Sequence, residues 1–550
     1  MDYKVPGVFV EEIPTLPPSV APVATAIPAF IGYTEKALDD SGRSLSAFPV
    51  IRRIDTMKEY EQFFGGPKLA KFRMDTTNNA LTAIKITDAN ADDDNALHKY
   101  LLYYSLRHYF DNGGGSCYVA SVGVYSSNPI KINEINNGID ALEKEDEPTL
   151  LVLADGIQLA TKSDYYSSCA KILMQCNKLK DRFGIFDMPD GETNENFRNG
   201  IGSNYLSYGC AYAPYLRTSL VYQYAEVDID VKSFFREKTD KGIKYAYVGS
   251  MGSSPKVEIT KDASATPNIS FSITTDSLRI TLKGDKATST EIITAWNDWK
   301  ENKGGFTLFA SGTSTDIPVG GNIALVPPTS GAYTMEMFKS SNTQHYNACK
   351  TELANQRVVL PPSSALAGIY ASVDRDRGVW KAPANVSLAS VIAPSRKITY
   401  EEQELLNVDP TSGKSINAIR SFAGKGTMVW GSRTLAGNDN EWRYIPVRRL
   451  FIFVEESLQK ATGFAVFEPN TPTTWLKVKA MAESFLFNLW QRGALAGPTP
   501  DKAYYVNVGL GKTMTPQDIL EGRMIVDVGI AAARPAEFIV LRFMHKLQEA

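Results

Sequence analysis

The chain has 550 residues, of which 43% are hydrophobic, enough for two or three domains with cores of their own. Its 58 basic and 61 acidic side chains leave a net charge of −3, which gives no reason to expect nucleic acid or an anionic membrane as the partner. The five cysteines are scattered, and we expect them to be reduced and buried rather than paired.

The beginning of the chain has the pattern of an extended arm. Residues 3–12 form a short strand candidate around Val8, Phe9 and Val10. The uncharged run 13–34 is long enough to cross a membrane, but its five prolines would break a helix repeatedly. We therefore interpret 1–23 as an N-terminal arm with a Pro-rich linker, and we expect neither membrane insertion nor an export signal.

From residue 24 onward, helices alternate with short apolar strands, which is typical of an α/β domain. We assign this domain to 24–231. Its expected helices are 95–110, 134–145 and 165–180. Its expected strands are 24–33, 116–124, 150–154, 183–187 and 209–212.

Residues 232–330 differ from the rest in being rich in Ser, Thr and Gly. Alternating patterns predict strands at 268–274 and 277–282, and apolar spacing predicts a helix at 289–300. We expect a β-rich insertion with Gly-rich links, exposed at the surface. The main body then continues over 331–435, where Ser363 is expected to cap a helix.

The last part, 436–550, has the pattern of an α+β domain. Apolar residues at helical spacing predict a helix over 447–461, followed by a short strand at Phe464–Phe467. A second helix starts at Pro472 and ends at Gly493, and Thr515 caps a one-turn helix that reaches Arg523. Further strands are expected at 503–508, 524–530 and 537–544.

Residues that carry chemistry are scarce in this chain. Its four histidines lack metal-site spacing, and no serine lies in a nucleophile-elbow motif. The stretches 509–513 and 424–427 each lack the first glycine of a phosphate-binding loop and are interpreted as turns. Asp374–Arg377 is interpreted as a surface charge pattern that sets register between copies. We expect no catalytic residue, metal or cofactor, with an α/β hydrolase-like enzyme as the alternative.

Several segments, in this order along the chain, resemble the contractile sheath proteins of phage tails and related injection systems. They are 5–12, 26–33, 109–119, 361–385, 419–422, 430–435, 442–470 and 534–547. The resemblance covers most of the chain except 232–330. Together with the patterns above it implies a multidomain α/β and α+β subunit with mixed sheets flanked by helices, extended terminal strand arms and a β-rich insertion.

The resemblance also implies a mechanical function. Such subunits stack as hexameric rings in a helical polymer around an inner tube, and contraction that starts at the baseplate drives the tube through a target cell envelope. The implied partners are further copies, the inner tube protein, and baseplate and tail-terminator or cap proteins. The particle would be assembled in the bacterial cytoplasm, and it is either a phage tail or a released tail-like particle. A static shell or filament is the alternative.

In this family, terminal segments add strands to the sheets of neighbouring copies. The resemblance therefore makes Val8, Phe9, Val10, Phe538, Ile539, Val540 and Leu541 the candidate strand arms. The one-turn helix after Thr515 offers polar side chains on a protruding turn. Its residues Gln517, Asp518, Glu521 and Arg523 are the candidate contact with the inner tube.

Overall fold

The computed structural model describes residues 20–77, 80–86, 98–126, 128–249, 254–274, 276–328 and 331–542. The chain divides into two compact units. Unit 1 contains 1–66, 100–218 and 360–550, and unit 2 contains 67–99 and 219–359. Unit 2 thus includes the expected insertion 232–330 together with segments on both sides of it, and the finer domain boundaries remain predictions.

A nine-stranded sheet organises the larger part of unit 1. Strand β1 (Pro28–Thr34) lies between β5 (Cys117–Val124) on one side and β6 (Leu150–Leu153) on the other, and all three are parallel. The parallel order continues through β7 (Phe183–Asp187) and β8 (Gly209–Ala213). These strands match the expected ones and confirm the α/β class.

Shorter strands extend this sheet at both edges. On one side β2 (Val50–Ile54) pairs antiparallel with β5. On the other, β23 (Asn417–Phe422) runs parallel to β8, followed by β24 (Gly426–Val429) and β21 (Val386–Ser387). Separately, β9 (Leu216–Val221) pairs with β22 (Val391–Pro394).

Helices cover both faces of the sheet. Helices α2 (Leu102–Asp111) and α9 (Ser363–Arg377) pack against each other, as do α3 (Ile132–Leu142) and α4 (Lys162–Leu179). The crossover from β1 to β5 and the one from β5 to β6 run in opposite directions. Crossovers between parallel strands are right-handed in nearly all proteins, and this rule places the two helix pairs on opposite faces. Three shorter helices complete this part: α1 (Met57–Phe64), α5 (Asn194–Gly200) and α10 (Tyr400–Asn407).

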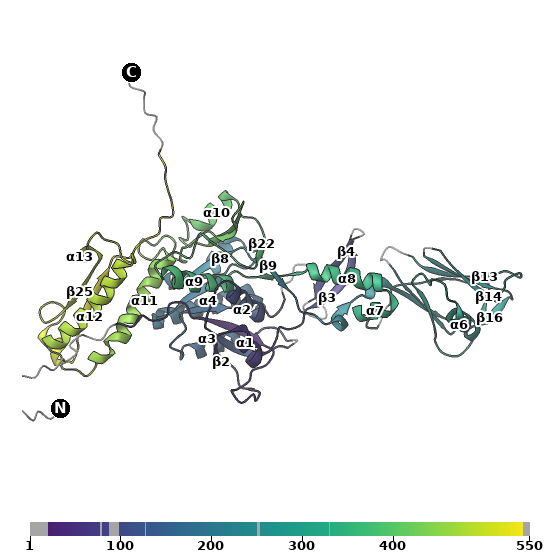
Figure 1. Ribbon diagram of the computed structural model, residues 1–550, viewed down its shortest axis with the longest axis horizontal. Coiled ribbons are helices and arrows are strands. Elements are labelled where there is room, and N and C mark those ends of the chain that lie inside the picture. The colour runs from purple at the N-terminus through teal and green to yellow at the C-terminus, as the bar shows by residue number, and fades with distance from the viewer. Residues whose placement is uncertain are drawn as a thin grey trace, which may run out of the picture. The chain divides into compact units, whose positions relative to one another are not determined.

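The C-terminal part of unit 1 is built on two long helices that lie side by side, α11 (Ile445–Ala461) and α12 (Pro472–Gln491) (Figure 1). Their shared core contains Leu450, Val454, Phe485 and Leu489. The remaining elements are α13 (Pro500–Ala503), β25 (Tyr504–Val508), α14 (Pro516–Leu520) and β26 (Val526–Ile530), and the two strands pair antiparallel. The expected α+β arrangement is confirmed here.

Three local expectations are wrong. Phe464–Phe467 is not a strand: its first two residues end a 3₁₀ turn, Thr462–Ala465, and no strand of the described residues pairs with this segment. The described part of the expected strand 537–544 is extended but pairs with no strand of the described chain. Ser363 is the first residue of α9 rather than its cap, and its hydroxyl donates to Asp187 instead.

Unit 2 begins with a hairpin that the sequence pattern did not indicate, β3 (Lys71–Thr77) and β4 (Ala80–Ile86), with β10 (Ile229–Asp230) added to β3. Two sheets follow. One contains β11 (Phe235–Asp240), β12 (Ile243–Val248) and β17 (Phe306–Ala310). The other contains β13 (Lys256–Lys261), β14 (Ile269–Thr274), β15 (Ser277–Leu282) and β19 (Asn322–Ala324).

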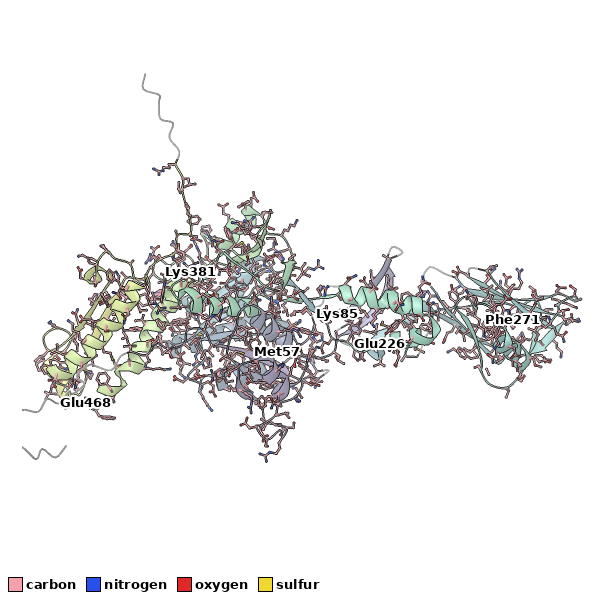
Figure 2. The ribbon with its side chains drawn as sticks, viewed as in Figure 1. Met57, Lys85, Glu226, Phe271, Lys381 and Glu468 are labelled. Carbon is pink, nitrogen blue, oxygen red and sulfur yellow. The ribbon has the colours of Figure 1, made fainter. Side chains whose placement is uncertain are left out.

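Helix α6 (Ser289–Asp298) contributes Trp296 to the core of these sheets, where Phe271, labelled in Figure 2, packs edge-on against it. The expected strands at 268–274 and 277–282 and the expected helix are confirmed. A small ladder, β16 (Lys286–Thr288) with β18 (Asp316–Pro318), completes the insertion.

Outside the insertion, unit 2 contains α7 (Phe338–Ser341), α8 (Thr343–Asn355) and β20 (Arg357–Leu360). The chain enters the insertion at Phe235 and leaves it near Tyr333. The ring centroids of these two residues are 4.6 Å apart, and Phe235 also stacks on Phe338. Aromatic packing therefore joins the two ends of the insertion to each other and to α7, so the attachment does not depend on Gly-rich links alone.

All five cysteines are free and buried: Cys117, Cys169, Cys176, Cys210 and Cys349. Burial raises the pKa of each thiol, that of Cys349 to about 11. The expectation of reduced, buried thiols is confirmed.

Candidate functional site

The C-terminal arm is the most exposed apolar segment among the candidate residues. Phe538, Ile539, Val540 and Leu541 are between 71% and 81% exposed. Figure 1 shows this segment extending away from the neighbouring elements of unit 1. Four consecutive large apolar side chains at this exposure are unusual for the surface of a soluble protein, and they make this segment a candidate contact. Val8, Phe9 and Val10 lie outside the described residues.

A second apolar surface lies in the C-terminal part of unit 1. A groove of about 1030 Å³ runs between α11, α12 and β26. Phe451, Leu458 and Val478 line it from the helices, and Val526, Val528 and Ile530 line it from the strand. Glu468, labelled in Figure 2, lies at its rim beyond the end of α11. The groove is mainly apolar, which suits an extended apolar segment.

The strand that lines this groove has an available edge. Within the described residues, β26 pairs with β25 alone, from Val508–Val526 to Tyr504–Ile530. Two-stranded sheets are marginally stable, and a third strand adds backbone hydrogen bonds. The groove and the edge together are therefore a candidate site for strand addition.

The N-terminal linker is docked from residue 20 onward. Val20 and Val23 pack against the core of the C-terminal part. The Val23 N–H donates to Ser457 Oγ at 3.3 Å, and the Thr25 carbonyl accepts from Arg449 Nη2 at 2.7 Å. The root of the N-terminal arm is thus fixed to α11.

Arg449 is itself held by Asp374 of α9, at 3.0 Å from Nη1 to Oδ1 and 2.5 Å from Nη2 to Oδ2. Both side chains are buried. Burial favours the neutral form of Arg449, but Asp374 holds the pKa of the guanidinium above its ordinary value. Asp374 is therefore part of the interior, and the interpretation of Asp374–Arg377 as a wholly exposed charge pattern is wrong. Arg375 and Asp376 do form an exposed pair.

The candidate tube-contact residues lie on a well-ordered turn. Thr515 caps α14 with a complete capping box, and Asp518 accepts from the Thr515 N–H and hydroxyl at 2.8 and 2.7 Å. Asp518 also accepts from Arg523 Nη2 at 2.7 Å. The Thr515 hydroxyl is the main cause that lowers the pKa of Asp518 to about 2. Asp518 shapes this turn, whereas Gln517 and Glu521 are exposed and bonded to each other at 2.7 Å.

The carboxyl ends of the parallel strands are where α/β proteins bind ligands, and here that position is filled. Asp155, which follows β6, accepts from the N–H groups of Tyr33, Leu101 and Leu102 at 2.7, 2.5 and 3.1 Å. Its carboxylate thus occupies the N-terminus of α2 in place of an external anion. A Cβ on Gly32 would lie 2.4 Å from this carboxylate, so the backbone closes tightly over it.

A second buried carboxylate, Asp187 at the end of β7, accepts from the N–H and hydroxyl of Ser363 at 2.7 and 2.6 Å. Burial raises the pKa of both Asp155 and Asp187 to about 7 against these hydrogen bonds. Each carboxylate fixes the start of a helix, α2 or α9, and both are buried and lie outside the groove described above.

Other chemical features are correspondingly few. In the described part of the chain, no three His, Cys, Asp or Glu side chains are grouped to hold a metal ion. The stretch Gly509–Thr513 is a backbone turn after β25, and Gly424–Thr427 runs from the turn after β23 into the first two residues of β24. Among the described helices, none combines the length and the hydropathy needed to cross a bilayer.

Sequence reasoning missed the contact that holds the root of the C-terminal arm. Arg433 lies in 430–435, one of the segments that resemble sheath proteins, but the sequence pattern indicates no role for this residue. In the structure Arg433 is buried and binds Glu537, the residue directly before the exposed arm. Arg433 stands between Ser432 and Thr434, so no local apolar pattern marks it as a buried residue.

Comparison with known proteins relates this architecture to one family. Residues 437–545 match the model of the phage tail sheath C-terminal domain. The tail sheath protein of Vibrio phage KVP40 is 21% identical over 231 residues, which are 41% of this chain and 33% of that protein. The match therefore spans about a third of the length of this curated relative.

Two solved structures are similar over nearly the full length. One is the sheath complex of the extracellular contractile injection system PVC in its contracted state, with 26% identity and a TM-score of 0.54. The other is the contracted helical sheath of the anti-feeding prophage, with 25% identity and a TM-score of 0.56. Each match covers 99% of this chain and 99% or 100% of the other chain.

Proposed function

Because the chain belongs to the family of contractile tail sheath proteins, we propose that it is the sheath subunit of a phage tail or a phage tail-like particle. It acts as a structural component and not as an enzyme. Copies polymerise as stacked hexameric rings around an inner tube. Contraction from the baseplate then drives the tube through the envelope of a target cell.

Two observations carry this proposal: the exposed apolar arm after Glu537, and an edge of β26 that no strand of the described residues pairs with. Burying four such side chains would contribute about 6–12 kcal/mol before the entropic cost of ordering the arm. An isolated chain gains none of this, because Phe538–Leu541 remain exposed. The natural occupant of the groove along β26 is a terminal arm of a neighbouring copy.

Backbone pairing of this kind suits a contractile lattice. Strand addition joins two subunits through an arm, so the bodies can rotate while the ladder stays intact. The N-terminal arm, with Val8, Phe9 and Val10, is proposed to act in the same way. Because the chain is docked from Val20 onward, only the part of the Pro-rich linker before that residue is proposed to act as a hinge.

The contact with the inner tube remains a proposal for the turn after Thr515. Its exposed members are Gln517, Glu521 and Arg523, with Leu520 also 81% exposed. A polar contact suits a sheath that must release the tube, because exposed ion pairs contribute only about 0–1 kcal/mol each. Glu521→Lys is expected to weaken co-sedimentation with the tube at low salt. Unchanged co-sedimentation would remove this turn as the contact.

Removal of Met1–Glu12, or of residues 538–550, tests the proposed function. Both truncated chains should be folded monomers by circular dichroism and sedimentation, and neither should form tubes in negative-stain micrographs. By contrast, removal of 232–330 should leave tube formation intact if the insertion faces outward. Tubes of normal length from either arm deletion would refute strand addition as the basis of assembly.

A further inference from the structure

The chain after β26 is tied to the body of unit 1 at two successive points. The first is backbone pairing: the Ala531 N–H donates to Ala503 O at 2.8 Å, and the Ala533 N–H donates to Ala494 O at 3.1 Å. The second is the side chain of Glu537. Beyond Glu537, the described residues are exposed.

The Glu537 carboxylate receives donors from three separate places in the fold. Arg433 donates from Nε to Oε1 at 2.9 Å and from Nη2 to Oε2 at 2.6 Å. Asn407, at the end of α10, donates from Nδ2 to Oε1 at 2.8 Å. Tyr444, just before α11, donates from its hydroxyl to Oε2 at 3.2 Å. Such a bidentate, charge-assisted arrangement fixes the orientation of the carboxylate as well as its position.

The receiving side of this contact is built independently of the arm. The Arg433 side chain is 4% exposed. Its Nη1 donates to the carbonyls of Asn407 and Gly437 at 3.4 and 3.3 Å, and its backbone N–H donates to Asn417 Oδ1 at 2.7 Å. The guanidinium is therefore held in place by neutral groups, and Glu537 is its carboxylate partner among the described residues. A buried cation prepared in this way recognises a carboxylate.

The transition from this contact to full exposure takes place within one residue, because Phe538 is 71% exposed. A segment attached at a fixed point and in a fixed direction samples a smaller volume. It therefore reaches a neighbouring site at a higher effective concentration than a segment with a free root.

We propose that Arg433 and Glu537 are a positioning pair that sets where and in which direction the C-terminal arm leaves the subunit. This inference rests on the proposed function, in which that arm adds a strand to a neighbour. The pair also fixes which of the following side chains face the partner sheet, because side chains alternate along a strand.

Glu537→Gln in the full-length chain tests the proposal, with Glu404→Gln as the matched control. Glu404 is exposed on α10, close to Asn407. We expect Glu537→Gln to slow tube formation at least ten-fold by light scattering, and the control to leave it unchanged. For a direct readout, spin labels at Ala423→Cys and Ile539→Cys report the spread of arm positions in the monomer. Both positions are exposed, and the five native thiols are buried. The distance distribution should broaden with Glu537→Gln only.

Insertion of glycine after Glu537 provides a second test that leaves the ion pair intact. One glycine shifts the alternation of the arm and should slow assembly ten-fold or more, whereas two glycines restore the alternation and should slow it less. The positioning role would be overturned if both insertion variants formed tubes at the wild-type rate, or if Glu537→Gln left the distance distribution unchanged. Tubes from the chain that lacks 538–550 would instead refute the proposed function of the arm.

Discussion

Replacing Asp374 by Asn tests how far the interior of unit 1 depends on the ion pair with Arg449. Asparagine keeps one acceptor oxygen and turns an amino group toward the other guanidinium N–H. Arg449 makes three hydrogen bonds, two to Asp374 and one to Thr25 O. In the variant it would keep one bond to the residue at position 374 and the bond to Thr25 O, and lose the third. Because the pair is buried, loss of the carboxylate leaves a charge uncompensated, which typically costs about 3–5 kcal/mol.

The free energy of unfolding is measured by urea denaturation with tryptophan fluorescence, comparing midpoints at constant slope. Asp376→Asn is the matched control, since Asp376 lies on the same helix in an exposed pair with Arg375. Its cost should be below about 1 kcal/mol. The double variant Asp374→Leu with Arg449→Met should recover much of the loss, because apolar pairs often replace buried ion pairs without cost. Equal costs for Asp374→Asn and Asp376→Asn would refute the assignment of this pair as a buried anchor.

Three further predictions follow from single residues. Burial raises the folded-state pKa of Asp187 from 3.8 to about 7. Its stabilising contribution is therefore complete below pH 3.8 and is lost as the pH rises through about 7. The wild type should lose stability relative to Asp187→Asn over that range, and parallel pH profiles of the two proteins in urea denaturation would contradict this. Phe467 is fully exposed with φ of 66°, so Phe467→Asn should raise the thermal midpoint through about 1 kcal/mol of relieved strain, and a lower midpoint would count against it. Gly32→Ala should destabilise unit 1 by about 1–3 kcal/mol in urea, because its Cβ would meet Asp155, whereas Gly115→Ala, which meets nothing within 4 Å, should not.

Features that depend on neighbouring residues could be predicted from the sequence. The apolar face of α12 and its start at Pro472 are examples, as is the Thr515 cap with Asp518 three residues later. Each signal lies within a few residues of the element that it specifies. The alternation of helices and apolar strands likewise predicted the α/β class.

Features that depend on distant partners could not be predicted. Phe464–Phe467 has the composition of a strand, yet a strand needs a partner, and no described strand pairs with it. Arg448, Arg449 and Glu456 look like the exposed face of α11, but they are buried because other elements cover that face. The pairing of Arg433 with Glu537 joins residues 104 apart in sequence, and no local pattern links them.

The burial of all five thiols has a consequence for the life of a particle made from many copies. Oxidation proceeds through the thiolate, and burial keeps each cysteine protonated and out of reach of solvent. A lattice that repeats an exposed cysteine would accumulate cross-links once it left a reducing compartment, and cross-links between subunits would lock it in one state. With its sulfur atoms inside, the chain avoids such cross-links in the proposed sheath, whether or not its surroundings keep thiols reduced.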